Sequence, residues 1–372
     1  MSGNSTRILA GLAAGLLGGT VLMAQQSTGT FKGRVTDKAT GAPKAGVTVT
    51  AENVGTGFVR TTTTNAEGMF RLPVMPLGSY RFSFKSVDSV ASLARQCALG
   101  QEVDASVAMA PALQATVAVV ATVDSVSENN VTSAEVGVNV SAERLESLPV
   151  LSRNVVQAAV LAPGVQLVQG GNVDPTKKAS TYMTTGDGQG RGTNFNIDGG
   201  DNNSTDVGGY VSSIPIDAVG EFQVVTNQYK AEFGRSNAGF LNVVSKAGSN
   251  AFSGVLSAQF TNQALRAMTA DEGDKKDSST LSLGATVAGP MLKDKLFFMV
   301  SAEKRKEEGA SATFAPAALT LFPEGAGIKT KIEQTTLYTR FDWNATSWLQ
   351  ATLTYSYDKN TTPNQSCGFI EG

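Results

Sequence analysis

The sequence predicts a mainly β protein in three parts: a small antiparallel sandwich, a compact α/β domain and a run of membrane-type strands. Over residues 28–111, short runs rich in Val, Thr and aromatic residues alternate with turn residues. Over 133–250, two helical patterns mix with several strand patterns. From 251 onward, segments of about ten residues alternate apolar and polar side chains, which is typical of strands that cross a bilayer.

The composition excludes several classes of function. The 372 residues are 17% charged with a net charge of −2, so nucleic acid is not expected as a partner. The chain has no histidine, which removes His-based triads and the commonest zinc and haem ligand. Its two cysteines, Cys97 and Cys367, fall in different predicted domains. We therefore predict no catalytic residue, no metal site, no cofactor and no enzymatic activity.

The first 24 residues have the pattern of a secretory signal peptide. Arg7 precedes an apolar run from Ile8 to Met23, and Ala24 offers a cleavage point. The alternative is a membrane anchor, but the run is shorter than the ~20 residues that a spanning helix needs. No other stretch reaches ~18 consecutive apolar residues, so a mature chain that spans a membrane would do so as a β-barrel.

Residues 28–111 predict the sandwich. Its expected strands are "FKGRVTD", "AGVTVTAEN", "FVRTTTT", "MFRLPV" and "YRFSFKS", and Gly68 stands where a hairpin turn needs positive φ. The landmarks "GRVTD", "AGVTVTAEN" and "TTTTNAEGMFRLPVMPLGSY" resemble the carboxypeptidase regulatory-like domain, a transthyretin/Ig-like β-sandwich. The stretch after Lys85 fits that pattern less well. The family name records structural kinship and implies no peptidase activity.

Residues 112–132 form a linker with a Val/Ala/Thr run and a polar tail. The run is either one more sandwich strand or an extended segment offered to a partner. The letters "TVAVVA" resemble a TonB box, which binds by adding a strand to a partner's sheet edge. The residues concerned are Thr116, Val117, Ala118, Val119, Val120 and Ala121.

Residues 133–250 predict a compact α/β domain. One helix is expected after an N-cap at Ser141 and a second after an N-cap at Ser152, ending at Pro163. Expected strand segments are "VQLVQ", "STYMTT", "TNFNID", "EFQVVTN" and "AGFLNVVS", the fourth preceded by a short helix.

The same domain resembles a known family. The runs "LESLPVLSRNVVQAAVLAPGV", "FNIDGGDNN" and "IPIDAVGEFQVVTNQYKAEFGRSNAGFLNVVSKAGSN" follow, in order and spacing, the plug domain of TonB-dependent outer-membrane receptors with an N-terminal regulatory-like sandwich. The resemblance implies an outer-membrane location with a periplasmic N-terminal domain. It implies two partners besides the lipid: the TonB energy-transducing protein of the inner membrane, and an extracellular ligand such as a siderophore, oligosaccharide or peptide.

Residues 251–372 predict part of an outer-membrane β-barrel. The run "AGPMLKDKLFFMVSAEKR" resembles the family's first barrel hairpin, with a turn from Pro290 to Lys295. There is room for about five or six strands, whereas a closed barrel needs at least ~8 and plugged transporters have ~22. An open edge in hydrocarbon would cost several kcal/mol for each unpaired backbone group. We therefore expect the chain to be the N-terminal fragment of a longer protein. Soluble sandwich strands are the alternative.

The stretch "GRGTNFNIDGGDNN", residues 190–203, is the richest in turn residues. Its glycine spacing does not fit a dinucleotide loop, and glycines at two ligand positions exclude an EF-hand. An irregular calcium site through Asp198, Asp201 and Asp206 stays open. The favoured interpretation is a plug strand, Thr193 to Asp198, that turns at Gly199-Gly200.

The polar loop after that turn is the candidate ligand-binding loop. Its candidate ligand contacts are Asn202, Asn203, Asp206 and Tyr210. The alternative is a loop that only fits the barrel wall. Four charged residues in or near the plug strands are expected to pair with each other or with the wall. They are Arg191, Glu221, Glu232 and Arg235.

The leading functional hypothesis is the N-terminal portion of a TonB-dependent outer-membrane receptor for energy-coupled uptake of an unidentified ligand. The alternative is a secreted adhesin whose β-sandwich binds carbohydrate or protein.

Overall fold

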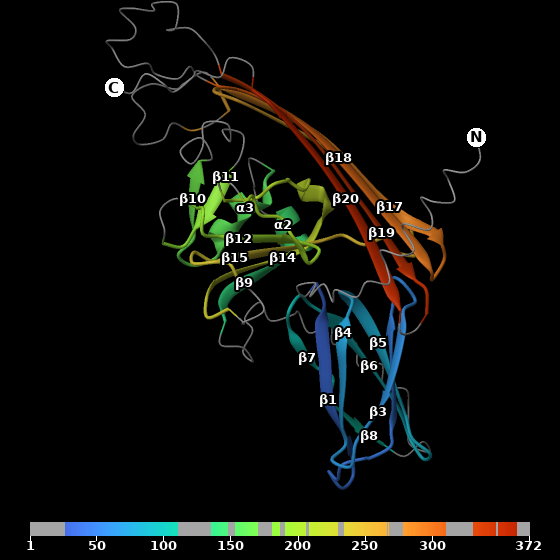
Figure 1. Ribbon diagram of the computed structural model, residues 1–372. Coiled ribbons are helices and arrows are strands. Elements are labelled where there is room, and N and C mark those ends of the chain that lie inside the picture. Colours follow the sequence, from blue (N-terminus) through green and yellow to red (C-terminus); the bar gives the residue numbers. More distant parts are fainter. Residues whose placement is uncertain are drawn as a thin grey trace, which may run out of the picture.

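The computed structural model describes residues 27–110, 135–147, 153–169, 181–186, 190–205, 208–229, 234–265, 267, 278–309, 330–346 and 349–362. Within them a β-sandwich, a middle domain and a sheet of five long strands follow one another in chain order (Figure 1). The predicted signal peptide, residues 1–24, and the box-like segment Thr116–Ala121 lie outside the described residues.

The sandwich consists of eight strands in two sheets. They are β1 (Gly29–Asp37), β2 (Thr48–Asn53), β3 (Val59–Thr63), β4 (Met69–Met75), β5 (Gly78–Lys85), β6 (Val90–Cys97), β7 (Glu102–Asp104) and β8 (Val107–Met109). One sheet has the order β4-β1-β7 with β8 also on β1, and the other has the order β3-β2-β5-β6. The expectation of an antiparallel sandwich is wrong for the last two strands, because β7 and β8 each pair with β1 in parallel. The stretch after Lys85 forms the regular strand β6.

Aromatic side chains from the two sheets meet in the sandwich core. Alternation along β5 directs Tyr80, Phe82 and Phe84 inward, and all three are fully buried with Phe31 of β1. The rings of Phe31 and Phe82 lie 4.8 Å apart, edge to face. Gly68 has the positive φ expected of it, 71°, and a Cβ there would lie 2.5 Å from the Val35 carbonyl oxygen.

The middle domain is built on a five-stranded mixed sheet of order β13-β12-β15-β14-β9. Its elements are β9 (Val136–Ser141), α2 (Ala142–Ser147), α3 (Val155–Ala158), η2 (Ala159–Leu161), β10 (Gln166–Gln169), β11 (Thr181–Thr184), β12 (Asn194–Ile197), β13 (Gly200–Asp201), η4 (Ile216–Ala218), β14 (Val219–Asn227) and β15 (Phe240–Ser245). Strands β10 and β11 form a separate hairpin. The predicted α/β architecture is therefore present, with helices shorter than the sequence pattern suggests.

Two local predictions for the middle domain were wrong in detail. The second helix begins at Val155, and its N-cap is Asn154, whose side-chain oxygen accepts the Val156 N–H at 2.9 Å. Asn154 thus takes the place predicted for Ser152. The turn after β12 is made by Asp198 and Gly199, both at positive φ, since Ile197 already pairs with Gly200.

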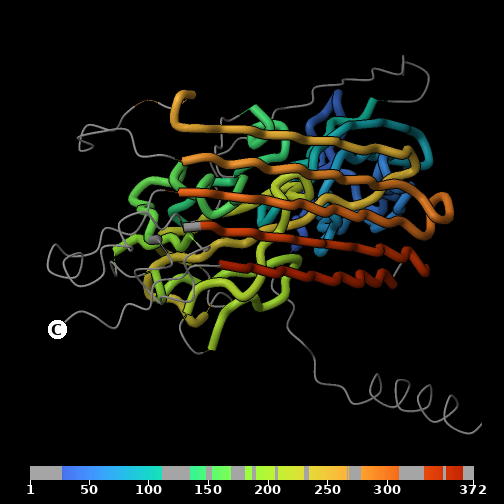
Figure 2. Tube along the Cα trace, turned by 90° about the horizontal axis from the view of Figure 1, so that it is seen from above, coloured from blue at the N-terminus to red at the C-terminus, as the bar shows by residue number. Residues whose placement is uncertain are grey.

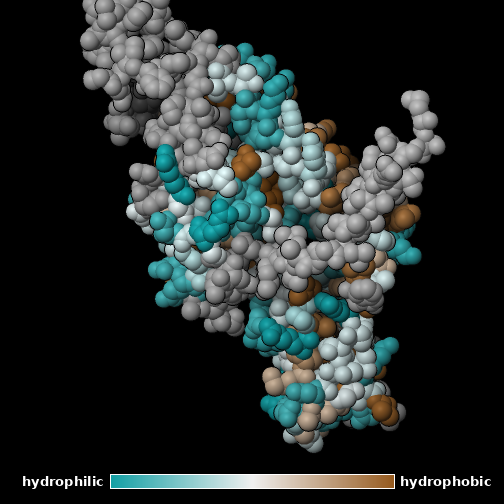
Figure 3. Space-filling model, viewed as in Figure 1, coloured by the Kyte–Doolittle hydropathy of each residue, from teal (hydrophilic) through white to brown (hydrophobic). Residues whose placement is uncertain are grey.

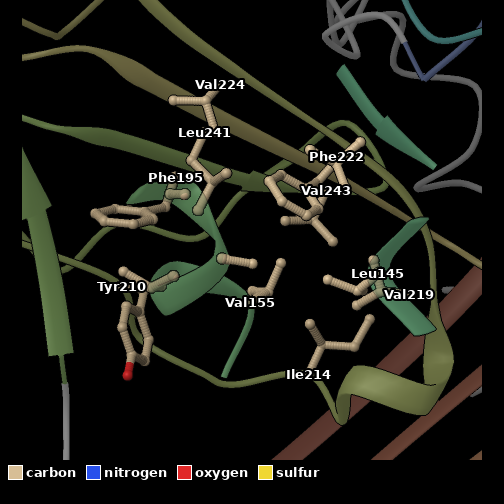
Figure 4. Close-up of a cluster of buried hydrophobic side chains, with 14 of the residues drawn as sticks. Leu145, Val155, Phe195, Tyr210, Ile214, Val219, Phe222, Val224, Leu241 and Val243 are labelled. Carbon is tan, nitrogen blue, oxygen red and sulfur yellow. The ribbon is translucent and has the colours of Figure 1, made fainter. Parts of the chain in front are cut away.

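One face of the middle sheet carries the hydrophobic core (Figure 4). Phe222 of β14, Leu241 and Val243 of β15, and Phe195 of β12 pack there against Val155 of α3. All of these side chains are at most 7% exposed. Burial of each such side chain contributes about 1.5–3 kcal/mol, so this face holds the helices on the sheet.

The strand sheet contains β16 (Ser253–Asn262), β17 (Ser279–Leu292), β18 (Leu296–Gly309), β19 (Thr330–Asn344) and β20 (Gln350–Thr361). Consecutive strands pair antiparallel, and the five lie side by side in chain order (Figure 2). The β17–β18 turn is shorter than predicted, because Pro290 still faces Phe297 across the ladder. Among the described strands, β16 pairs only with β17 and β20 only with β19, so the sheet is open.

The strand sheet exposes apolar side chains on its outer face and buries polar side chains on the face towards the middle domain. Leu256, Phe260, Leu283 and Leu353 are 51–87% exposed on one face, whereas Ser282, on the other face, is 2% exposed. Figure 3 shows apolar residues along the margin of this sheet that points away from the middle domain. An apolar outer face with a polar inner face is the pattern of a barrel wall in lipid. Among the helices that the structure describes, none has the length and apolar character to cross a bilayer.

Candidate functional site

A buried ionic cluster, here the Arg153 network, joins the middle domain to the inner face of the strand sheet. The Arg153 guanidinium donates to the Asp217 carboxylate of η4 and, through Nε, to Glu303 of β18 at 3.0 Å. Its Nη2 also reaches the Ser257 Oγ of β16 at 3.0 Å, and that hydroxyl donates to Asp217 at 2.6 Å. The side chains of the three charged residues are 9–15% exposed. The Arg153 guanidinium therefore binds one carboxylate of the middle domain, Asp217, and one of the strand sheet, Glu303.

Local backbone features make room for the Arg153 network. Arg153 has a φ of 53°, a conformation that costs a non-glycine residue free energy and persists only where surrounding contacts enforce it. Across the interface, a Cβ at Gly284 would lie 2.6 Å from the Ser257 Oγ and 3.3 Å from an Asp217 oxygen. A side chain at position 284 would therefore displace the network.

A second cluster, the Asp198 network, joins the middle domain to strand β19 of the strand sheet. The Asp198 carboxylate accepts bonds from the Tyr338 hydroxyl at 2.7 Å and from Arg340 Nη1 at 3.2 Å. Within the middle domain it also accepts the Ser245 N–H at 2.8 Å. Arg340 bonds Asp342 as well, at 2.8 Å. Because Asp198 follows β12 at positive φ, the turn itself aims this carboxylate at the wall.

A third contact reaches the last described strand. The Ser213 N–H donates to Asp358 of β20 at 3.0 Å, and Gln334 of β19 donates to the Ser213 hydroxyl at 3.1 Å. With the two networks, the middle domain is bonded to β16, β18, β19 and β20. The middle domain is therefore held against the polar face of the strand sheet by hydrogen bonds to four of its strands.

The structure places three of the four candidate ligand contacts inside the middle domain. Tyr210 is 6% exposed and lies beside Phe195, and its hydroxyl accepts the Thr181 N–H at 3.3 Å (Figure 4). The Asn202 side chain makes three hydrogen bonds with Ser212, at 2.9, 3.0 and 3.2 Å. Asn203 accepts the Phe195 N–H at 2.9 Å. These polar groups hold the loop in shape, and Asp206 lies outside the described residues.

The charged residues singled out in the sequence have different surroundings. Arg235 pairs with Asp201 at 2.6 Å, both more than half exposed. Glu221 accepts a backbone N–H from the sandwich, that of Leu99, and not a side-chain cation. Glu232 lies outside the described residues. Within the described ranges, no group of three or more Cys, Asp or Glu side chains is close enough to hold a metal ion.

The three bodies meet around a cavity of about 550 Å³. Gly55 and Cys97 line it from the sandwich, Glu221 and Lys246 from the middle domain, and Arg340 from the strand sheet. Sequence reasoning did not single out this junction, because its residues come from distant segments with no common motif.

Comparison with known proteins supports the resemblance on which the sequence reasoning rested. The model of the carboxypeptidase regulatory-like domain matches residues 30–110, and that of an outer membrane beta barrel domain matches residues 244–326. The TonB-dependent transporter Oar of Myxococcus xanthus is 32% identical over 305 residues, which cover 77% of this chain and 27% of that protein. The chain belongs to the TonB-dependent outer-membrane receptors.

As a member of this family, the protein is located in the outer membrane. The chain spans about a quarter of the length of its curated relative. Solved structures with a similar backbone include the siderophore receptor PirA from Acinetobacter baumannii, at 18% identity and a TM-score of 0.45, covering 61% of this chain and 32% of that one. The outer membrane transporter YddB from Escherichia coli is similar at 15% identity and a TM-score of 0.46, covering 61% and 33%.

The residues that fasten the middle domain to the wall were mostly missed by sequence reasoning. The sequence points to Asp198 only as the end of a strand and as a calcium candidate, and it does not single out Arg153, Asp217 or Glu303. Arg153 and Glu303 are 150 positions apart, so no local pattern links them. The available signal was the presence of charges inside strands and helices of a domain expected to be enclosed.

Proposed function

We propose that this protein is a receptor for energy-coupled uptake, in which the middle domain is the plug of a barrel that includes the strand sheet. The observation that carries the proposal is the pair of buried networks on Arg153 and Asp198, which fix the domain to the polar face of that sheet. The apolar outward face of the sheet supports a lipid-embedded wall and disfavours the alternative, a soluble adhesin.

Uptake in this scheme needs no covalent chemistry. An extracellular ligand of the siderophore, oligosaccharide or peptide class binds on the outer side, where the loop from Asp201 to Tyr210 contributes to the site. Asn202, Asn203 and Tyr210 act there by holding the loop, since their polar groups bond within the domain. Ligand binding and partner binding then bias one plug equilibrium, and that coupling is reciprocal.

The TonB protein of the inner membrane is the proposed partner, and Thr116–Ala121 is its proposed contact. A segment of this kind binds by strand addition, so backbone hydrogen bonds dominate. The pull that TonB exerts has to break the Arg153 and Asp198 networks or let their members find new partners. Breaking one buried charge pair by loss of a partner costs about 3–5 kcal/mol, which sets the scale of work.

Deletion of Thr116–Ala121 in the full-length gene tests this proposal. We expect uptake to be abolished while binding is retained, measured with radiolabelled ferric chelates, oligosaccharides and peptides on intact cells. The matched control deletes six residues of the same linker, Asp124–Asn129, and keeps uptake. Unchanged uptake in the Thr116–Ala121 deletion would rule that segment out as the TonB contact.

A further inference from the structure

A short loop of the sandwich, Cys97–Gln101, is here named the docking loop because it fits onto the middle sheet. The Leu99 N–H donates to both oxygens of Glu221 on β14, each at 3.2 Å. The Leu99 carbonyl accepts Asn139 Nδ2 of β9 at 3.0 Å, and the Leu99 side chain is fully buried. Both backbone groups of one residue are thus bonded to side chains of another domain.

The docking loop is shaped for this contact. Gly100 has a φ of 66°, and a Cβ there would lie 3.3 Å from the Gln223 side-chain oxygen of β14. The Gly100 N–H donates to the Thr28 carbonyl at 3.2 Å, which ties the loop back to the start of the sandwich. Glycine therefore permits both the backbone conformation and the close approach.

Glu221 is bonded differently from the carboxylates at the strand sheet. Glu143 of α2 lies near it, and the Cys97 thiol of β6 lines the same cavity. The nearby cations are engaged elsewhere: Lys246 bonds Glu146 at 3.0 Å, and Arg340 bonds Asp342. In the described residues, the only hydrogen-bond donor to Glu221 is the neutral Leu99 N–H.

This environment disfavours the ionised form of Glu221. Burial raises the pKa of the Glu221 carboxyl to about 7, the Leu99 N–H opposes that rise, and the negative charge of Glu143 adds to it. Removal of the docking loop would return water to the carboxyl and take its pKa towards the ordinary value of 4.5.

We propose that the sandwich is held on the middle domain by a proton-controlled latch, in which the docking loop binds β9 and β14 while Glu221 carries a proton and loosens when Glu221 ionises. Because the docked state holds the proton more tightly, docking is strongest below pH 4.5 and weakens as the pH rises through about 7. The rise from 4.5 to about 7 corresponds to an about 300-fold loss in the docking constant.

Loosening of the latch would free the side of the middle domain next to β9. Among the described strands β9 pairs only with β14, so its other edge is open for pairing with a further strand. Docking controls access to the cavity where the three bodies meet. This inference is independent of the ligand and of the TonB contact.

Hydrogen–deuterium exchange of the full-length protein in detergent micelles tests the latch. Protection of the peptide that contains Leu99, corrected for the intrinsic pH dependence of exchange, reports the opening constant of the docking loop. We expect protection to fall about 100-fold between pH 5 and 8, with most of the fall below pH 7 and a constant value above it. Peptides of β2 in the sandwich interior keep their protection and serve as the internal reference.

Two variants complete the test. Glu221→Gln keeps an acceptor for Leu99 but cannot ionise, so protection stays high and independent of pH. Glu143→Gln, which changes an exposed neighbour, keeps the transition and moves its midpoint slightly down. A wild-type loop whose corrected protection is constant from pH 5 to 8, or a Glu221→Gln variant that retains the full transition, overturns the proposal. The wild-type titration decides by itself if the Gln variant fails to fold.

Discussion

The middle domain has two interfaces with opposite chemistry. Towards the strand sheet, carboxylates meet guanidinium groups and hydroxyls, as Asp198 does with Arg340 and Tyr338. Towards the sandwich, the half-buried Glu221 carboxylate meets a neutral backbone N–H. A neighbouring cation favours the ionised form of a carboxylate, whereas burial without a cation favours the protonated form. The first interface is therefore built to hold and the second to respond.

The largest expected effect is at Arg153. Arg153→Met leaves Asp217 and Glu303 buried without their shared cation, so the contact between the middle domain and the strand sheet should lose about 3–5 kcal/mol. Hydrogen exchange of β14 and β15 in micelles, with and without urea, measures the loss. Adding Glu303→Gln should recover part of it, and strict additivity of the two changes would show that the residues are not coupled.

Asp198 and Asp201 allow a buried and an exposed carboxylate of the same turn region to be compared. Asp198→Asn removes charge-assisted bonds from a side chain that is 5% exposed, with an expected loss of about 1.5–3 kcal/mol in the same exchange experiment. Asp201→Asn removes an ion pair whose carboxylate is 53% exposed, and should cost less than about 1 kcal/mol. Equal losses for the two variants would mean that the Asp198 network does not fasten the domain.

Gly100 tests the weaker interface. Gly100→Ala imposes a strained φ and pushes a methyl group towards Gln223, so the docking loop should lose about 1–2 kcal/mol of docking free energy. Leu99 protection at pH 5 measures it. The matched control is Gly41→Ala. Gly41 has nearly the same φ, 71°, but a Cβ there would have no neighbour within 4 Å, so this change should strain the sandwich and leave docking unchanged. Loss of Leu99 protection in both variants would point to general destabilisation of the sandwich.

Much of the fold could be predicted from local patterns. Alternation identified the five strands of the strand sheet, and in the sandwich Gly68 was correctly expected at positive φ, although its turn joins two strands of different sheets. The N-cap of α3 was misplaced because Ser152 and Asn154 are both good caps and stand two residues apart. The parallel pairing of β7 and β8 with β1 was also missed, since strand order depends on how the chain returns and leaves no periodic trace.

The charged residues show where such reasoning fails. Glu221 is expected from the sequence to pair with another of these charges or with the barrel wall, but it accepts the N–H of Leu99, 122 positions away. Asp198 was considered as a metal ligand, but its partners Tyr338 and Arg340 are 140 and 142 positions away. A carboxylate looks alike in sequence whether it will meet a guanidinium, an amide or water.

By itself the sequence determined which segments are strands, which face of each is apolar, and where glycine must turn the chain. These properties depend on a side-chain period of two and on local steric limits, both of which short stretches carry. Only the tertiary structure decided which carboxylates find cations and which lose water without one. Desolvation and pairing depend on groups brought within a few ångströms of each other from distant parts of the chain, and that proximity also sets whether Glu221 holds its proton.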